Sequence, residues 1–208
     1  VGQIIQFVVS VLLARLLLPE DFGLMAMVVV FISLAQVFMN FGFGSALIQD
    51  KDTTQADLST IFYLNVVIGI ILFLGTYFIS DYVALFYEVS AISKILRLLS
   101  VTFIISSFGI VPNVILTKEI KFNKVVKVDV ASGLFSGLAA VVMAYYNYGV
   151  YSLIVQRILA SLLRTVFIFL ASKWKPSSVF IFASVKKYIS FSSNILFINI
   201  ISKTLDEL

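Results

Sequence analysis

The feature that most limits how this chain folds is the apolar run Val150–Ser172, which carries two arginines in its interior. At about 1.5 Å per residue, a helix of this length spans roughly 35 Å, more than a bilayer hydrocarbon core of about 30 Å. Arg157 would lie roughly 10 Å from one end and Arg164 roughly 12 Å from the other. The two positions are nearly two helical turns apart, so both side chains leave the same face, with Ser161 between them. A membrane helix that accepts two such charges needs a partner for them.

Composition extends this conclusion from one run to the whole chain. Of the 208 residues, 61% are hydrophobic and 12% are charged, and the mean hydropathy is +1.07. Soluble domains are nearer one half apolar and one quarter charged, so the chain is an integral membrane protein. The sequence has no cysteine and no histidine, which excludes thiolate metal sites and removes the commonest metal ligand. We therefore expect no metal and no cofactor.

Seven apolar spans predict an all-α polytopic membrane protein. They cover residues 1–18, 23–48, 58–80, 98–117, 128–146, 150–172 and 188–203. The second, fourth and sixth connections hold nine lysines, whereas the first, third and fifth hold three basic residues: Arg15, Lys94 and Arg97. Because basic loops stay in the cytoplasm, these even-numbered connections and the N-terminus are predicted to be cytoplasmic. Both ends of the chain lie in or beside apolar runs, so we expect a piece of a longer protein.

The third connection, residues 81–97, is longer than the others near it and has its own apolar pattern. Its apolar residues recur at helical spacing, at Leu85, Val89, Ile92, Leu96 and Leu99. This spacing predicts a short amphipathic helix lying on the outer membrane interface. The alternative is an ordinary structured loop.

Polar residues in the second span supply further candidates for a binding site. Ser33, Gln36, Asn40 and Gly44 recur there in steps of three and four, and so share one helix face. Gln36 and Asn40 are candidate substrate-binding residues, although amides in membrane helices also form interhelical hydrogen bonds. Arg15, near the end of the first span, is another candidate. Its alternative role is to extend its side chain to the lipid headgroups.

The two arginines of the sixth span are the main candidates for ligand binding. Arg157 is too deep to reach the headgroups comfortably, and a charge at this depth is costly unless it meets water or an anion. Asp129 lies toward the cytoplasmic end of the neighbouring antiparallel span, so it could pair with Arg164 but hardly with Arg157. We therefore expect Arg157 to line a water-filled cavity that binds an anion, joined by Arg164 unless Asp129 or the headgroups satisfy it. Guanidinium suits phosphate because its fork binds two oxygens and keeps its charge.

Enzyme and nucleic-acid functions find no support in the sequence. There is no Walker A loop, no pair of deep carboxylates and no serine elbow, so we expect that the protein is not an enzyme. The lysine clusters adjoin apolar spans, and orientation in the membrane explains them better than nucleic-acid binding does.

Several motifs resemble a known family. They are ARLLLPEDFGLMAM at 14–27, FGFGSALIQ at 41–49, DLST at 57–60, GVYSL at 149–153 and KWKP at 173–176. With them the chain resembles, over nearly its whole length, the bacterial polysaccharide flippases of the O-antigen, capsule and colanic-acid type. These belong to the multidrug/oligosaccharidyl-lipid/polysaccharide exporter superfamily. The resemblance implies two related helical bundles around a central cavity. Residues 1–187 would form the six-helix N-terminal bundle, and 188–208 the first helix of the second.

The resemblance also implies a substrate and a mechanism. The substrate would be an undecaprenyl-pyrophosphate-linked oligosaccharide repeat unit, moved across the bacterial inner membrane by alternating access through a cationic lumen and driven by an ion gradient. Expected partners are this lipid-linked oligosaccharide, membrane lipids and other polysaccharide assembly proteins, with no nucleic acid. Two alternatives stay open. A cation-coupled multidrug efflux pump would need acids in its cavity, whereas the deep charges here are basic, and a non-transporting scaffold of polysaccharide assembly would have no use for deep arginines.

Overall fold

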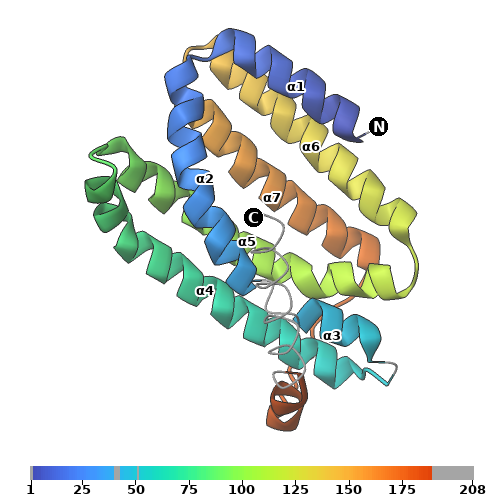
Figure 1. Cartoon of the computed structure of the whole chain (residues 1–208). Helices are drawn as coiled ribbons and strands as arrows, with labels where there is room; N and C mark the ends of the chain where they lie inside the picture. Colours follow the sequence, from blue (N-terminus) through green and yellow to red (C-terminus); the bar gives the residue numbers. More distant parts are fainter. Residues whose placement is uncertain (1, 40–42, 51, 189–208) are drawn as a thin grey trace, which may run out of the picture.

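The computed structural model describes residues 2–39, 43–50 and 52–188, which form helices joined by short connections (Figure 1). The helices are α1 (Gly2–Leu16), α2 (Pro19–Met39), α3 (Phe43–Gln49), α4 (Gln55–Phe86), α5 (Ala91–Lys118), α6 (Phe122–Tyr145) and α7 (Val150–Ser172). Residues 182–188 are also helical. In the described part of the chain, five segments are long and apolar enough to cross a membrane: Pro19–Gln49, α4, α5, α6 and α7. The predicted all-α polytopic membrane fold is confirmed.

The helices pack in an order that differs from their order in the chain. α1 lies along α6, α6 along α7, α7 along α5, and α5 along α4, while α2 crosses the bundle and contacts α4, α5 and α7 (Figure 1). α5 and α7 are therefore central, each with neighbours from both halves of the chain. The expected seventh span, 188–203, lies outside the described residues apart from Tyr188. The division into bundles at residue 187 stays a prediction.

Two connections between helices meet at one end of the bundle. α2 begins with Pro19, whose missing N–H would lack a partner in a first helical turn anyway, and Asp21 accepts a hydrogen bond from the backbone N–H of Leu18 at 3.2 Å. α7 begins after Gly149, whose φ of +55° is one that other residues rarely adopt. A Cβ atom at Gly149 would lie 3.2 Å from an Asp21 carboxylate oxygen. The two turns that carry the PEDFG and GVYSL motifs are thus packed together.

The expected amphipathic helix at 81–97 is wrong. α4 continues to Phe86 and α5 begins at Ala91, so only a short turn joins them. Within that turn Glu88 has a φ of +55°, which helps to reverse the chain. Ile92 and Leu96 are 0% and 1% exposed in the bundle core. Their helical spacing therefore marks the buried face of α5 and not a face that lies on the membrane surface.

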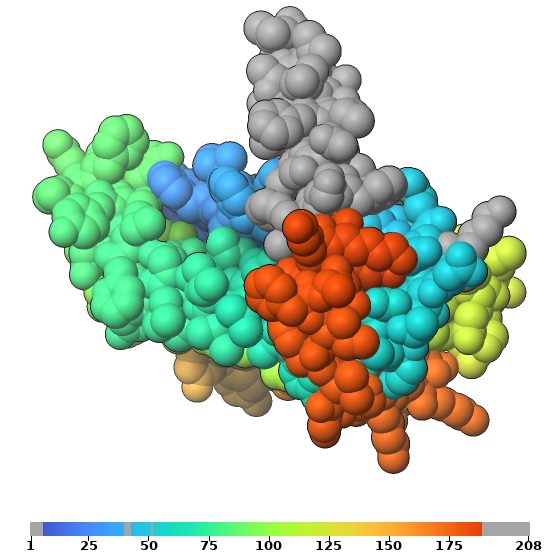
Figure 2. Space-filling view, turned by 90° about the horizontal axis from the view of Figure 1, so that it is seen from below, coloured from blue at the N-terminus to red at the C-terminus, as the bar shows by residue number. Residues whose placement is uncertain are grey.

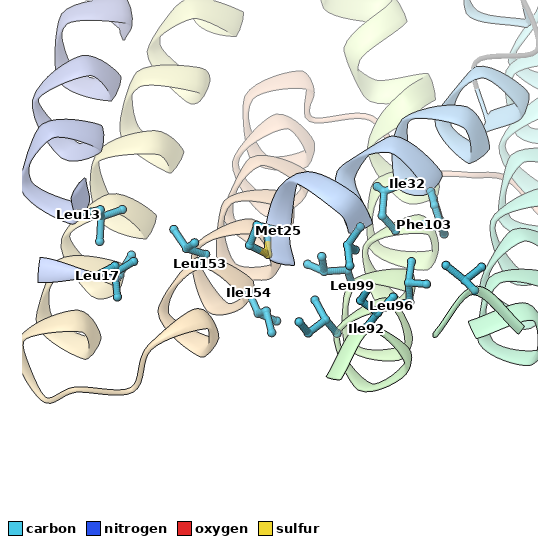
Figure 3. Close-up of a cluster of buried hydrophobic side chains, with 14 of the residues drawn as sticks. Leu13, Leu17, Met25, Ile32, Ile92, Leu96, Leu99, Phe103, Leu153 and Ile154 are labelled. Atoms are coloured by element: carbon cyan, nitrogen blue, oxygen red, sulfur yellow. The ribbon is translucent and has the colours of Figure 1, made fainter. Parts of the chain in front are cut away.

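The largest buried cluster in the described part of the chain connects α1, α2, α4, α5, α6 and α7. The side chains labelled in Figure 3 come from α1 (Leu13), the turn after it (Leu17), α2 (Met25, Ile32), α5 (Ile92, Leu96, Leu99, Phe103) and α7 (Leu153, Ile154). Other large apolar side chains point outward, among them Phe78, Phe86 and Leu170, which are 68%, 78% and 68% exposed. In a membrane protein such residues contact lipid tails, so an apolar outer surface is expected.

At the other end, the segment 173–188 is hydrogen-bonded to Asp50, just after α3, and to the start of α4. Figure 2 shows this segment, in orange-red, beside α3 and the start of α4, in cyan. Trp174 Nε1 donates to Gln55 Oε1 at 2.8 Å, and the Ser59 and Ser177 hydroxyls are 2.8 Å apart. These contacts join the DLST and KWKP regions. The segment is therefore an integral part of the packed bundle and not a loose linker.

Asp50 binds two residues of this segment through its carboxylate. Lys187 Nζ lies 2.6 Å from its Oδ2 atom, and the Tyr188 hydroxyl donates to the same oxygen at 2.5 Å. The hydrogen bonds from Lys187 and Tyr188 lower the pKa of Asp50 from its ordinary value of 3.8 to about 2. The aspartate in turn raises the pKa of Lys187. Asp50 is therefore fully charged throughout the neutral range.

Candidate functional site

A polar cavity of about 330 Å³ lies among α2, α5, α6 and α7, and Gln6 of α1 also lines it. Its polar lining includes Gln36, Thr102, Ser106, Asp129, Arg157 and Arg164. Apolar side chains such as Val29 and Leu99 complete the wall. A cavity with this many polar groups inside an apolar bundle needs water or a polar ligand, because unpaired polar groups are costly in a membrane.

The helix α7 contributes both cationic groups of the cavity. Arg157 and Arg164 line it from the same side, as their spacing predicted, and Ser161 lies between them. The Ser161 hydroxyl is 2.9 Å from that of Ser106, and Thr165 donates to the Ile105 carbonyl at 3.1 Å. These two hydrogen bonds join α7 to α5 and fix the rotation of α7. The rotation in turn determines where the arginines point.

Small residues on α5 allow that close contact. A Cβ atom at Gly109 would lie 3.2 Å from the Thr165 hydroxyl, so the two helices approach closely here. Gly109, Ser106 and Asn113 belong to one stripe of α5 that faces α7. The stripe therefore serves helix packing and also contributes polar atoms to the site.

Arg164 is paired on both sides. Its Nε atom lies 2.8 Å from Asp129 Oδ1, and its Nη2 atom lies 3.3 Å from Asn113 Oδ1. Of the alternatives that the sequence left open for Arg164, the structure shows the pair with Asp129. Asn113 was not among the sequence candidates, although its place on the polar stripe of α5 was a signal for it. Both members of the ion pair remain accessible, with 40% and 48% of their side-chain surfaces exposed.

Arg157 differs from Arg164 in having no such partner. Among residues 2–39, 43–50 and 52–188, no ion pair or side-chain hydrogen bond involves Arg157. It is exposed and lines the cavity, whose acidic residue in the described chain, Asp129, is bonded to Arg164. The cavity therefore has a surplus of positive charge at Arg157. Such a site favours an anion.

The remaining candidates have different outcomes. Gln36 of α2 lines the cavity. Asn40 lies outside the described residues. Arg15 is exposed near the end of α1 and is not one of the residues around the cavity. Three of the five sequence candidates, Arg157, Arg164 and Gln36, thus surround one space.

The fold and this site define a polytopic helical membrane protein whose bundle contains an open polar cavity with excess positive charge. The chain belongs to the polysaccharide biosynthesis protein family, whose model matches residues 12–208. The family resemblance inferred from the motifs is therefore confirmed.

Three curated relatives show what the chain is similar to. The teichuronic acid biosynthesis protein TuaB of Bacillus subtilis is 28% identical over 161 residues, which cover 76% of this chain and 33% of TuaB. The lipopolysaccharide biosynthesis protein WzxC of Escherichia coli is 27% identical, over 87% of this chain and 37% of WzxC. The succinoglycan biosynthesis transport protein ExoT of Rhizobium meliloti is 24% identical, over 85% and 36%. The chain thus spans about a third of the length of these relatives. No solved structure gives a significant match.

Proposed function

We propose that this chain is the N-terminal part of a transporter, not an enzyme, that moves an undecaprenyl-pyrophosphate-linked oligosaccharide across the bacterial inner membrane. The observation that carries the proposal is Arg157, a cation without a partner among the described residues, in a polar cavity inside a membrane bundle. Family membership supports the substrate class, because the relatives are named for the synthesis or transport of surface polysaccharides. Alternating access around this cavity would give the pyrophosphate a path through the membrane.

The cavity has groups that suit both the pyrophosphate and the sugars of such a substrate. Guanidinium binds phosphate oxygens through paired N–H donors, and its charge offsets the cost of bringing a pyrophosphate into the membrane. Gln36, Ser33 and Thr102 supply amide and hydroxyl groups at the same cavity, which can bind sugar hydroxyls. The apolar lipid tail would stay in the bilayer, beside the apolar outer surface of the bundle.

The orientation we propose places the basic connections in the cytoplasm. Lys118 Nζ donates to the Asp50 carbonyl and, at 2.8 Å, to Thr53 Oγ1, so the connections after α3 and α5 lie together. The segment 173–188 adjoins them through Lys187 and Asp50. The lysines of the connection after α5 and of the segment 173–188 are therefore gathered at one end of the bundle, as the positive-inside rule requires of a cytoplasmic face. Arg164 would be the inner arginine and Arg157 the outer one.

A test of this function replaces Arg157 with alanine in the full-length protein. The variant gene is returned to a strain from which the original has been deleted, and surface polysaccharide is measured together with the amount of protein in the membrane. We expect surface polysaccharide to be lost at normal protein levels, and partly kept with Arg157→Lys. Arg97→Ala is the matched control. Arg97 Nη2 lies 2.5 Å from Asp81 Oδ2, and this ion pair does not line the cavity.

Two results of this experiment would contradict the proposal. Wild-type polysaccharide with Arg157→Ala would exclude the assigned role of Arg157 and favour a scaffold that tolerates its loss. Normal polysaccharide combined with new sensitivity to organic cations, once the gene is deleted, would favour an efflux pump. The pairing of Asp129 with Arg164 argues against such a pump, since it neutralises the acid that a cationic substrate would need.

A further inference from the structure

The two arginines of the cavity are not equivalent, and the difference lies in which edge of each guanidinium is occupied. The Nε and Nη2 groups form one of the two edges through which a guanidinium binds two oxygens side by side, and Nη1 and Nη2 form the other. In Arg164 this edge is filled by Asp129, at 2.8 Å from Nε, and by Asn113, at 3.3 Å from Nη2. An anion that is to bind this edge of Arg164 must therefore displace the carboxylate.

We propose that Asp129 is a resident anion that holds Arg164 while the cavity is empty and is exchanged for the phosphate group of the substrate. The inference rests on the proposed function and adds a specificity-determining residue to it. Arg157 would make the first contact with the phosphate, and Arg164 would bind it through its Nε and Nη2 groups as Asp129 leaves. A group with one weak negative charge would not complete this exchange, whereas a diphosphate, which carries more charge, would.

The ion pair has the properties that such an exchange needs. Its two side chains are 40% and 48% exposed, so water and ligand reach them from the cavity. Pairs this accessible contribute little to stability, and breaking one leaves neither charge buried. The diphosphate replaces the lost contact at Arg164 and gains a second one at Arg157, so the exchange favours the loaded cavity.

The same exchange would promote release. When the substrate moves away from Arg164, Asp129 can return, and the cavity then holds one unpaired arginine instead of two. A transporter must bind its substrate and also let it go, and two unopposed arginines would hold a diphosphate strongly. Asp129 would thus weaken binding and speed transport.

A purely structural role for Asp129 makes the opposite prediction. Asp129 is on α6 and Arg164 on α7, so the pair could simply hold these helices together. Loss of the carboxylate would then loosen the cavity and weaken anion binding. The two roles therefore differ in the sign of the effect, not only in its size.

The experiment measures binding of inorganic pyrophosphate to the purified full-length protein by titration calorimetry. We expect Asp129→Asn to increase the affinity by roughly fivefold or more, because a competing charge next to the site is removed. Asp129→Glu should stay near the wild-type affinity. Asp81→Asn is the matched control, because it removes the acid from the Arg97 pair, which does not line the cavity. It should leave the affinity unchanged.

The outcomes separate this inference from the proposed function. Unchanged or weaker binding by Asp129→Asn, while Arg157→Ala loses binding, overturns the exchange and leaves the proposed function intact. Wild-type binding by Arg157→Ala overturns the proposed function. No binding by either wild type or Asp129→Asn overturns the exchange, and the polysaccharide assay of Arg157→Ala then judges the proposed function. If Asp129→Asn fails to fold, Asp129→Ser gives the same test. In cells, tighter binding should come with less surface polysaccharide.

Discussion

Gly149 lies directly against Asp21, and a Cβ atom at Gly149 would come within 3.2 Å of its carboxylate. The two residues are far apart in the sequence but close the same end of the bundle, where α2 and α7 begin. Asp21 accepts the Leu18 N–H there, while Gly149 adopts a φ of +55°. The contact fixes where α7 begins in the bundle. It therefore also sets how far along the bundle Arg157 and Arg164 lie.

Gly149→Ala should destabilise the protein by about 1–3 kcal/mol, because alanine resists this backbone conformation. Thermal unfolding of the full-length protein in detergent measures the effect. Gly75→Ala is the control, because nothing lies within 4 Å of the added methyl group and the position is helical. The control should be neutral or slightly stabilising. Equal effects of the two changes would contradict the strain assigned to Gly149.

Gly137→Ala should destabilise the contact between α1 and α6. A Cβ atom there would lie 2.6 Å from a Val9 methyl group, so one helix must move. Overpacking of this kind costs about 1–3 kcal/mol. Adding Val9→Ala makes room, and the double variant should recover part of the loss in thermal stability. A purely additive double variant would exclude the clash.

Acid should weaken the contact between Asp50 and Lys187. Asp50 has a pKa of about 2 in the folded protein, below its ordinary value of 3.8, so its charged form stabilises the fold. That contribution is complete above the ordinary value and is lost as the pH falls through about 2. Limited proteolysis of the 173–188 segment with an acid-stable protease, between about pH 5 and about pH 2, follows the loss. Asp50→Asn should show little of this pH dependence, and identical curves for both proteins would contradict the assignment.

Arg164→Ala should reduce pyrophosphate affinity by roughly tenfold. The variant loses a charge-assisted contact with the ligand, and Asp129, left without its partner, repels the pyrophosphate. Adding Asp129→Ala removes the repulsion and should restore part of the affinity. Calorimetric titration of the single and double variants gives the coupling between the two residues. A double variant that binds more weakly than Arg164→Ala would show that Asp129 aids binding and would oppose its role as a competitor.

Much of the site could be predicted along single helices. The spacing of Arg157 and Arg164 places them on one face of any helix, and the antiparallel order of α6 and α7 brings Asp129 to the inner arginine.

The helix ends were harder to predict. Residues 81–97 looked like a separate element because their apolar spacing is the same whether the face meets lipid or protein. Their burial depends on partners from distant parts of the chain.

The sequence by itself determined the class of protein and the charges that need a partner. Long apolar runs must be helices in a membrane, because each backbone group there has to be bonded within its own segment. Only the tertiary structure decided which helices are neighbours. α2 crosses α5 and α7 while α1 lies against α6, so Gln36 and Arg157 share a cavity and Arg15 is left outside it. Which helices become neighbours depends on how well their surfaces fit, as at the contact of Gly109 with Thr165. The two residues belong to different helices, so the sequence of either helix alone does not show the contact.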